Sequence, residues 1–136
     1  MLARETGLPL PSKLLLICPW LVLDPSSPEQ AVIEPRDVIL TLSGIAEAGK
    51  LYADTLPVGD PICSPLFGSW EGMPPILAFG GGNDILVVDA RRLKAQHPAT
   101  DYVEMPGMMH VWPIFSFSES RSAQKQMADF AGRAIP

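Results

Sequence analysis

The chain has 136 residues, of which 47% are apolar and 18% are charged, and its formal net charge is −5. This apolar content exceeds that of disordered tails, and the length fits one domain or part of one. The acidic balance argues against nucleic acid and anionic membranes as partners, because both attract clustered Lys and Arg. The longest apolar run, residues 14–23, is broken by Pro19 and is too short to span a bilayer.

No basic segment followed by an apolar stretch and a cleavage site opens the sequence, which favours an intracellular, cytoplasmic protein. Cys18 and Cys63 show neither a CxxC spacing nor a metal-ligand spacing. We therefore expect both cysteines to be small buried apolar residues, and we expect no metal or other cofactor.

The predicted elements begin with residues 1–6, which resemble the last turns of a helix that stops at Gly7. The apolar run 13–18 predicts a parallel strand buried on both faces. Residues 21–35 contain turn formers and no clear period, which predicts a loop. Apolar residues at helical spacing then predict an amphipathic helix over 36–54.

After a proline-rich connection, residues 76–79 predict a second strand and residues 85–96 a helix capped by Asn83 or Asp84. Residues 100–104 predict a third strand. The motif Ser-x-x-Glu at residues 116–119 predicts a capping box that opens a final helix. Strands and helices alternate, which predicts an α/β fold with three parallel strands joined by crossover helices.

Asp84 follows the second strand and the three glycines Gly80, Gly81 and Gly82, at the point where a helix begins. One interpretation is structural, because Asp is a favoured N-cap residue. The other is functional, because the carboxyl ends of parallel strands are where sites are built and a helix N-terminus favours an ionised carboxylate. The two roles are compatible. We expect the glycines to supply the backbone freedom for the turn that aims Asp84.

His110 lies between the apolar residues Met109 and Val111, and a histidine with such neighbours can be a buried structural group. Its loop follows the third strand, however, which places it at the same sheet edge as Asp84. An imidazole bonded to Asp84 would have its tautomer fixed and could act as a base toward a hydroxyl. His97 precedes a proline at a helix exit and is expected on the surface.

An acid followed in the chain by a histidine, each after a buried strand, is the closing half of a serine–acid–histidine hydrolase order. The sequence contains no Gly-x-Ser-x-Gly motif. The segment 68–72 has its serine one place early and follows no strand, so it cannot form the nucleophile elbow. The three glycines lack the spacing of a dinucleotide-binding loop. The residues therefore indicate an acid and a base without a recognisable nucleophile.

Several segments resemble, in the right order, the hormone-sensitive-lipase-like family of α/β-hydrolases, the fold-3 esterases; they are residues 7–11, 14–20, 60–66, 73–76, 82–89 and 107–110. The resemblance implies a single partial α/β-hydrolase domain over residues 1–136, the C-terminal portion, whose nucleophile-bearing half would precede Met1. It implies that Asp84 is the catalytic acid and His110 the catalytic histidine. It also implies that Asp89 is structural.

The expected function is hydrolysis of small carboxylic esters, completed by an N-terminal half, with the chain alone inactive. Candidate substrate-binding residues are Trp20, Leu21, Phe67 and Trp70. The alternative is a non-catalytic binding or interaction module on the same α/β scaffold. We also expect an unpaired sheet edge, which would allow self-association.

Overall fold

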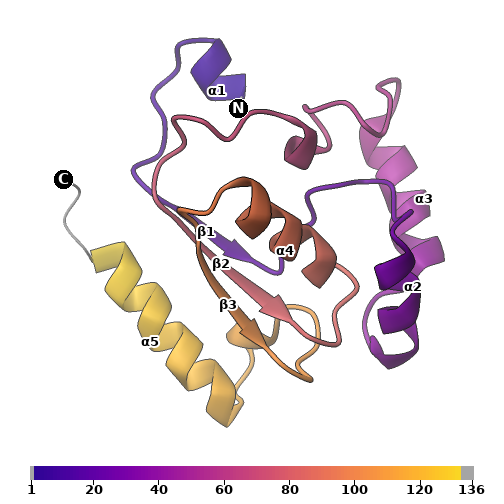
Figure 1. The fold of residues 1–136 in the computed structure, drawn as a ribbon, viewed down its shortest axis with the longest axis vertical. Coiled ribbons are helices and arrows are strands. Elements are labelled where there is room, and N and C mark those ends of the chain that lie inside the picture. The colour runs from indigo at the N-terminus through magenta and orange to yellow at the C-terminus, as the bar shows by residue number, and fades with distance from the viewer. Residues whose placement is uncertain (1, 133–136) are drawn as a thin grey trace.

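The centre of the structure, a computed structural model that describes residues 2–132, is a parallel sheet with the strand order β1-β2-β3 (Figure 1). The strands are β1 (Leu14–Ile17), β2 (Ile76–Gly81) and β3 (Asp101–Met105). Leu14 of β1 pairs with Ile76, and Leu77 of β2 pairs with Asp101. All three strands therefore end at one edge of the sheet. The predicted α/β fold with three parallel strands is confirmed.

Five α-helices connect and flank these strands in the described residues: α1 (Leu2–Glu5), α2 (Pro28–Ile33), α3 (Leu42–Ala53), α4 (Val87–Gln96) and α5 (Ser118–Gly132). Short 3-10 turns occur at Glu34–Arg36, Pro65–Phe67 and Trp112–Ile114. Among residues 2–132, no helix combines the length and the apolar character needed to cross a bilayer.

The helix α2 contradicts the prediction of a loop over residues 21–35. Pro28 stands in its first turn, where a backbone N–H would have no partner in the helix. The side chain of Gln30 accepts a hydrogen bond from the Ser27 N–H at 3.2 Å. With six residues, α2 is too short to show a hydrophobic period, so the Ser-Pro pair is the usable sequence signal.

Two other helices start later than predicted. α3 begins at Leu42 rather than at residue 36, and the Thr41 Oγ1 accepts a hydrogen bond from the Gly44 N–H at 3.1 Å. α5 begins at Ser118, one residue later than a helix capped by Ser116 would begin, and the Ser118 Oγ donates to the Glu119 carboxylate at 2.8 Å. At α3 a local polar side chain therefore caps the first turn.

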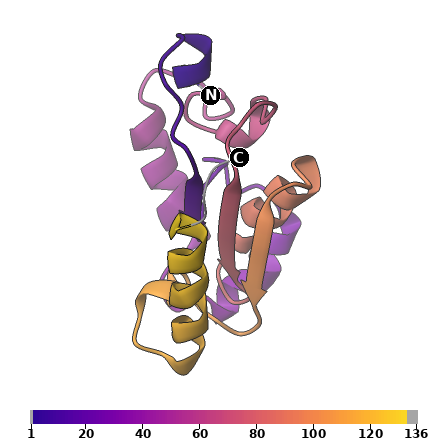
Figure 2. The same cartoon turned by 90° about the vertical axis from the view of Figure 1, so that its left-hand side faces the viewer.

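Both faces of β2 are covered, and each of its six residues is buried. On one face Phe79 packs with Phe130 of α5, and on the other Ile76 packs with Leu93 of α4. Figures 1 and 2 show α4 and α5 beside the sheet. Burying a side chain of this size contributes about 1.5–3 kcal/mol. β2 is therefore the rigid centre on which the loops at the carboxyl edge are built.

The outer strands are less covered. Within the described sheet β1 pairs with β2 alone, and Leu15 is 42% exposed in the middle of β1.

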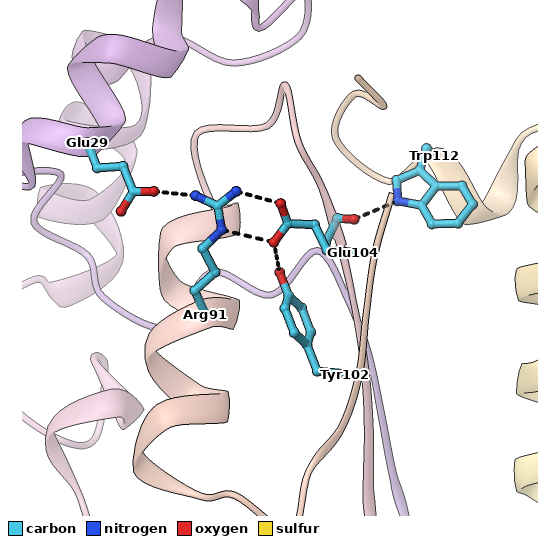
Figure 3. Close-up of polar contacts among 6 residues, drawn as sticks. Glu29, Arg91, Tyr102, Glu104 and Trp112 are labelled. Atoms are coloured by element: carbon cyan, nitrogen blue, oxygen red, sulfur yellow. Dashed lines mark hydrogen bonds and ion pairs between the residues drawn. The ribbon is translucent and has the colours of Figure 1, made fainter. Parts of the chain in front are cut away.

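On the other side of the sheet, hydrogen bonds and ion pairs of a charged cluster join β3 to the helices, as Figure 3 shows. The Arg91 Nε of α4 donates to the Glu104 carboxylate at 2.9 Å, and its other nitrogens reach Glu104 and Glu29 of α2. The Tyr102 hydroxyl donates to Glu104 at 2.7 Å.

Candidate active site

Asp84 lies in the loop between β2 and α4, and its side chain is fully buried. Its backbone N–H donates to the Gly81 carbonyl at 3.0 Å, and its Oδ1 accepts from the Leu86 N–H at 2.8 Å. The carboxylate thus organises the turn that leads into α4, as a capping residue would. Only Oδ1 serves this purpose, which leaves Oδ2 for another partner.

That partner is His110. The imidazole Nδ1 lies 2.9 Å from the Asp84 Oδ2, and 19% of the histidine side chain remains exposed. An ionised carboxylate only accepts hydrogen bonds, so the contact places the ring proton on Nδ1 and leaves Nε2 as an acceptor. The structure therefore brings together the acid and the histidine that the sequence singled out, 26 residues apart in the chain.

Gly81, the last residue of β2, allows this contact because it has no side chain. A Cβ on Gly81 would lie 2.5 Å from the Met108 carbonyl oxygen and 2.6 Å from that of Met109. The Asn83 N–H also donates to Met108 O at 2.9 Å, which fastens the two loops together. The prediction that these glycines supply backbone freedom is wrong, because Gly80–82 have no positive φ. Gly107, with φ of 74°, makes the turn that needs glycine.

The residue after the histidine is held in a rare conformation. Val111 has φ of 51°, a region that a β-branched side chain adopts at a cost of about 1–3 kcal/mol. The neighbouring Trp112 is fully buried, and its Nε1 donates to the Gly80 carbonyl at 3.0 Å. The Ser120 Oγ of α5 donates to Trp112 O at 2.7 Å. These anchors hold His110 where it meets Asp84.

Cys18 is a site residue that the sequence reasoning missed. It follows β1 directly, has φ of 48°, and its thiol lies in one cluster with Asp84 and His110. Burial raises the pKa of the Cys18 thiol to about 12, with a further contribution from the charge of Asp84. The usable signal was positional, because Cys18 ends a strand at the same sheet edge as Asp84. Cys63 is also buried, as expected, but its sulfur lies 3.4 Å from the Pro57 carbonyl oxygen in a separate cluster.

A cavity of about 390 Å³ opens beside the histidine. Its lining is mainly apolar and comes from the end of β1, the start of α3 and the two loops; the residues are Cys18, Trp20, Ile39, Leu40, Thr41, Gly44, Ile45, Ala48, Leu86 and His110. Such a lining suits an apolar ligand group with a single polar centre.

Of the four predicted substrate-binding residues, Trp20 lines this cavity. Leu21 and Trp70 are buried instead in the cluster between β2 and α4. Phe67 is half exposed and lies under the Arg92 guanidinium, 5.7 Å from its ring centre. The structure therefore brings one of the four to His110. The helix α3, whose Ile45 faces the cavity, supplies the wall that the sequence reasoning left out.

Asp89 acts within the fold. Its Oδ2 accepts hydrogen bonds from the N–H groups of Leu21 and Val22, at 2.8 and 2.9 Å. Burial raises the pKa of this carboxyl, and these two donors partly offset the effect. The segment after β1 is thereby held against α4.

Comparisons with known proteins support the fold. The model of the alpha/beta hydrolase fold family matches residues 1–114. An acetyl-hydrolase from Streptomyces hygroscopicus is 32% identical over 114 residues, which cover 80% of this chain and 38% of that protein. An esterase from Acinetobacter venetianus is 30% identical over 129 residues, covering 90% of this chain and 43% of the esterase.

The crystal structure of an esterase from the bacterial hormone-sensitive lipase family superimposes with a TM-score of 0.90 at 26% identity, over 99% of this chain and 48% of the other. The chain thus spans about two fifths of the length of these two relatives, and about half of this structure. It belongs to the α/β-hydrolase family, in the group that resembles hormone-sensitive lipase.

Proposed function

We propose that Asp84 and His110 are the acid and the histidine of a serine esterase that hydrolyses small carboxylic esters. The observation that carries the proposal is the 2.9 Å contact between the Asp84 Oδ2 and the His110 Nδ1 beside an apolar cavity. The serine comes from a nucleophile-bearing half outside these 136 residues. The names of the relatives, an acetyl-hydrolase and an esterase, support the same reaction class.

In the proposed mechanism the serine hydroxyl attacks the ester carbonyl carbon, and the His110 Nε2 takes the hydroxyl proton. The ionised Asp84 stabilises the imidazolium and keeps the ring in the orientation that this transfer requires. The imidazolium then gives the proton to the leaving alcohol, and an acyl-enzyme remains. Water, deprotonated by His110, releases the acid and restores the serine.

The exposed side of β1 supports the proposed place of the missing half. A parallel strand added beside β1 would pair with its outer backbone and would end at the same carboxyl edge as Cys18. A helix that accompanies such a strand would cover Leu15. A serine after such a strand would then face the site, since parallel strands carry their functional loops at one edge. Leu51 and Tyr52 of α3, 79% and 71% exposed, offer further apolar surface for that half. The alternative is that the lateral side of β1 pairs with a second copy of the chain.

The cavity supports a substrate with an apolar group. Ile39, Leu40 and Ile45 line one wall of the cavity. Among the described residues, no Asp, Glu, Lys or Arg side chain lines it. A short or medium acyl or alcohol group would fit this surface.

The test is a split enzyme. The chain is fused to, and separately mixed with, the part of the Acinetobacter venetianus esterase that lies outside the matched segment, and p-nitrophenyl acetate hydrolysis is followed. Activity is expected in the fusion, and loss of about 10³-fold or more in His110→Ala, since the histidine acts as the general base. His97→Ala is the matched control. A folded, active fusion whose turnover survives His110→Ala contradicts the proposal.

A non-catalytic binding module is the second candidate, because this chain forms the cavity from its own residues. It predicts that the chain alone binds a p-nitrophenyl ester saturably without turnover, and that the fusion remains inactive. An active fusion that depends on His110 decides against this candidate.

A further inference from the structure

The end of each strand contributes one metal-binding side chain to the same place. Cys18 follows β1, Asp84 lies after β2, and His110 lies after β3. One ligand atom from each residue, the thiol sulfur, a carboxylate oxygen and a ring nitrogen, lies within 4.8 Å of the others. This is the one such group of three among the described residues. Asp84 and His110 are the proposed catalytic pair, but the thiol of Cys18 has no task in that chemistry.

We propose that Cys18, Asp84 and His110 form a binding site for a thiophilic divalent cation of the zinc class. Binding of the ion and the base function of His110 exclude each other, so the ion would inhibit the proposed hydrolysis. The binding itself does not depend on that function and is measured on this chain without any turnover.

The donor set selects the ion. Thiolate, imidazole and carboxylate together suit zinc and its soft relatives, whereas calcium and magnesium prefer sites made of oxygen alone. Zinc–sulfur and zinc–nitrogen bonds of about 2.3 and 2.1 Å bring the two atoms to roughly 3.5 Å in a tetrahedral site. Small side-chain rotations close the present spacing of up to 4.8 Å to that distance.

The surroundings leave room for a fourth ligand. Cys18 and His110 both line the cavity of about 390 Å³, so a water molecule can reach an ion held between them. The charges also balance, because one thiolate and one carboxylate neutralise a divalent ion beside a neutral imidazole. Without an ion a cysteine thiol is ordinarily protonated at neutral pH.

Binding therefore exchanges a proton for the ion. The S–H bond of Cys18 breaks, the sulfur donates its electron pair to the metal, and the proton passes to the buffer. The imidazole binds the ion through Nδ1, the nitrogen beside Asp84, and the proton of that nitrogen moves to Nε2, so the ring donates a lone pair and loses no proton overall. One proton is released per ion at neutral pH, as expected for a thiol that is protonated in the free chain.

The experiment titrates the 136-residue chain with Cd²⁺ and with Co²⁺. We expect one ion per chain, the near-ultraviolet absorption of a metal–thiolate bond, and one proton released per ion by calorimetry in two buffers. Cys18→Ser is expected to remove the absorption and to weaken binding by about 100-fold. His110→Ala and Asp84→Asn are each expected to weaken binding by about 10- to 100-fold.

The chain contains a matched control for every ligand. Cys63→Ser, His97→Ala and Asp89→Asn change the other buried cysteine, the other histidine and the other buried aspartate, and all three should leave binding unchanged. Near-ultraviolet circular dichroism checks that each variant is folded, and Cys18→Ala is a second variant if Cys18→Ser is not.

Three results would overturn the site. They are no binding at millimolar Cd²⁺, a thiolate absorption that persists in folded Cys18 variants, and an affinity that is unchanged in His110→Ala. An active fusion enzyme with any of these results would leave the esterase proposal standing. An ion bound by a chain whose fusion stays inactive would support the metal site and contradict the esterase proposal.

Discussion

Two polar clusters in this fold differ in how many of their hydrogen-bonding groups remain unused. In the Arg91 cluster every charged group has hydrogen-bond partners. The guanidinium donates to Glu104 and Glu29, and Glu104 also accepts from Tyr102. The cluster at Asp84 pairs one carboxylate with one imidazole, and the second ring nitrogen lies beside a cavity.

The pKa directions express this difference for the first cluster. The hydrogen bonds with Arg91 and Tyr102 lower the pKa of Glu104, and the hydrogen bond with Glu104 raises that of Arg91. Burial and the bond to Glu104 raise the pKa of Tyr102. Each group is thus held in one protonation state, which suits a structural tie. Proton transfer needs a group with an unused acceptor, which is what His110 retains.

The largest effect is expected on kcat, from a substitution at Asp84. In the active fusion, Asp84→Asn should lower kcat by about 10⁴-fold, because an amide no longer fixes the histidine tautomer or stabilises the imidazolium. Nitrogen-15 spectra of the His110 ring report the tautomer directly. Asp89→Asn is the control. An unchanged tautomer together with unchanged kcat would show that Asp84 only shapes its turn.

The next effect concerns the contact between the loops. Gly81→Ala places a methyl group 2.5 Å from a backbone oxygen of the histidine loop, so the loop must move. We expect a loss of about 2–3 kcal/mol in the free energy of unfolding, as for overpacking, and a loss of the Asp84–His110 contact.

Gly59→Ala is the control for this substitution, because its Cβ would meet only a ring atom of Phe67 at 3.9 Å. Chemical denaturation measures stability, and the ring spectrum of His110 measures the contact. Equal stability of the two alanine variants would contradict the packing argument.

The Arg91 cluster should respond in stability and not in catalysis. Glu104→Gln removes the charge-assisted hydrogen bonds, and we expect about 1–2 kcal/mol of destabilisation at pH 7, reduced by the partial exposure of the cluster. Turnover of the fusion per folded molecule should stay the same. Glu47→Gln, on the exposed side of α3, controls for loss of charge alone. A fall in turnover that exceeds the loss of folded protein would contradict the division into two clusters.

The same variant gives a pH signature. Arg91 lowers the pKa of Glu104 below its ordinary value of 4.5, so the ionised group stabilises the fold above that pH. The contribution is lost as the pH falls through the lowered value in the folded state. The stability difference between the native chain and Glu104→Gln should therefore shrink below pH 4.5. Denaturation curves at several pH values test this. A difference in the free energy of unfolding that stays constant with pH would contradict a stabilising role for the ionised Glu104.

The smallest effect is expected at Asp89. Burial raises its pKa above the ordinary 3.8, so its ionised form costs stability at neutral pH and this cost disappears as the pH falls. Asp89→Asn keeps an oxygen acceptor for Leu21 and Val22 and removes the charge. We expect a change of less than about 1 kcal/mol, in the stabilising direction at pH 7. A loss of several kcal/mol would mean that the charge itself holds the segment after β1.

Local signals predicted the strands well. The runs that became β1 and β2 are apolar and bounded by proline, glycine or polar residues. β3 has the sequence Asp-Tyr-Val-Glu-Met and was located by its place between two predicted helices. The helix starts were harder, because they depend on single hydrogen bonds such as that between Thr41 and Gly44. The six-residue helix α2 left no periodic pattern at all.

For the site, chain order alone singled out Asp84 and His110, because each follows a strand and parallel strands share one carboxyl edge. The sequence determined this pair, the α/β class and the family resemblance through features that lie within short segments. Only the tertiary structure decided that Cys18 joins the pair, that α3 forms the cavity wall, and that Gly81 is needed for space. These three facts depend on distances between segments far apart in the chain, and such distances are set by packing rather than by local pattern.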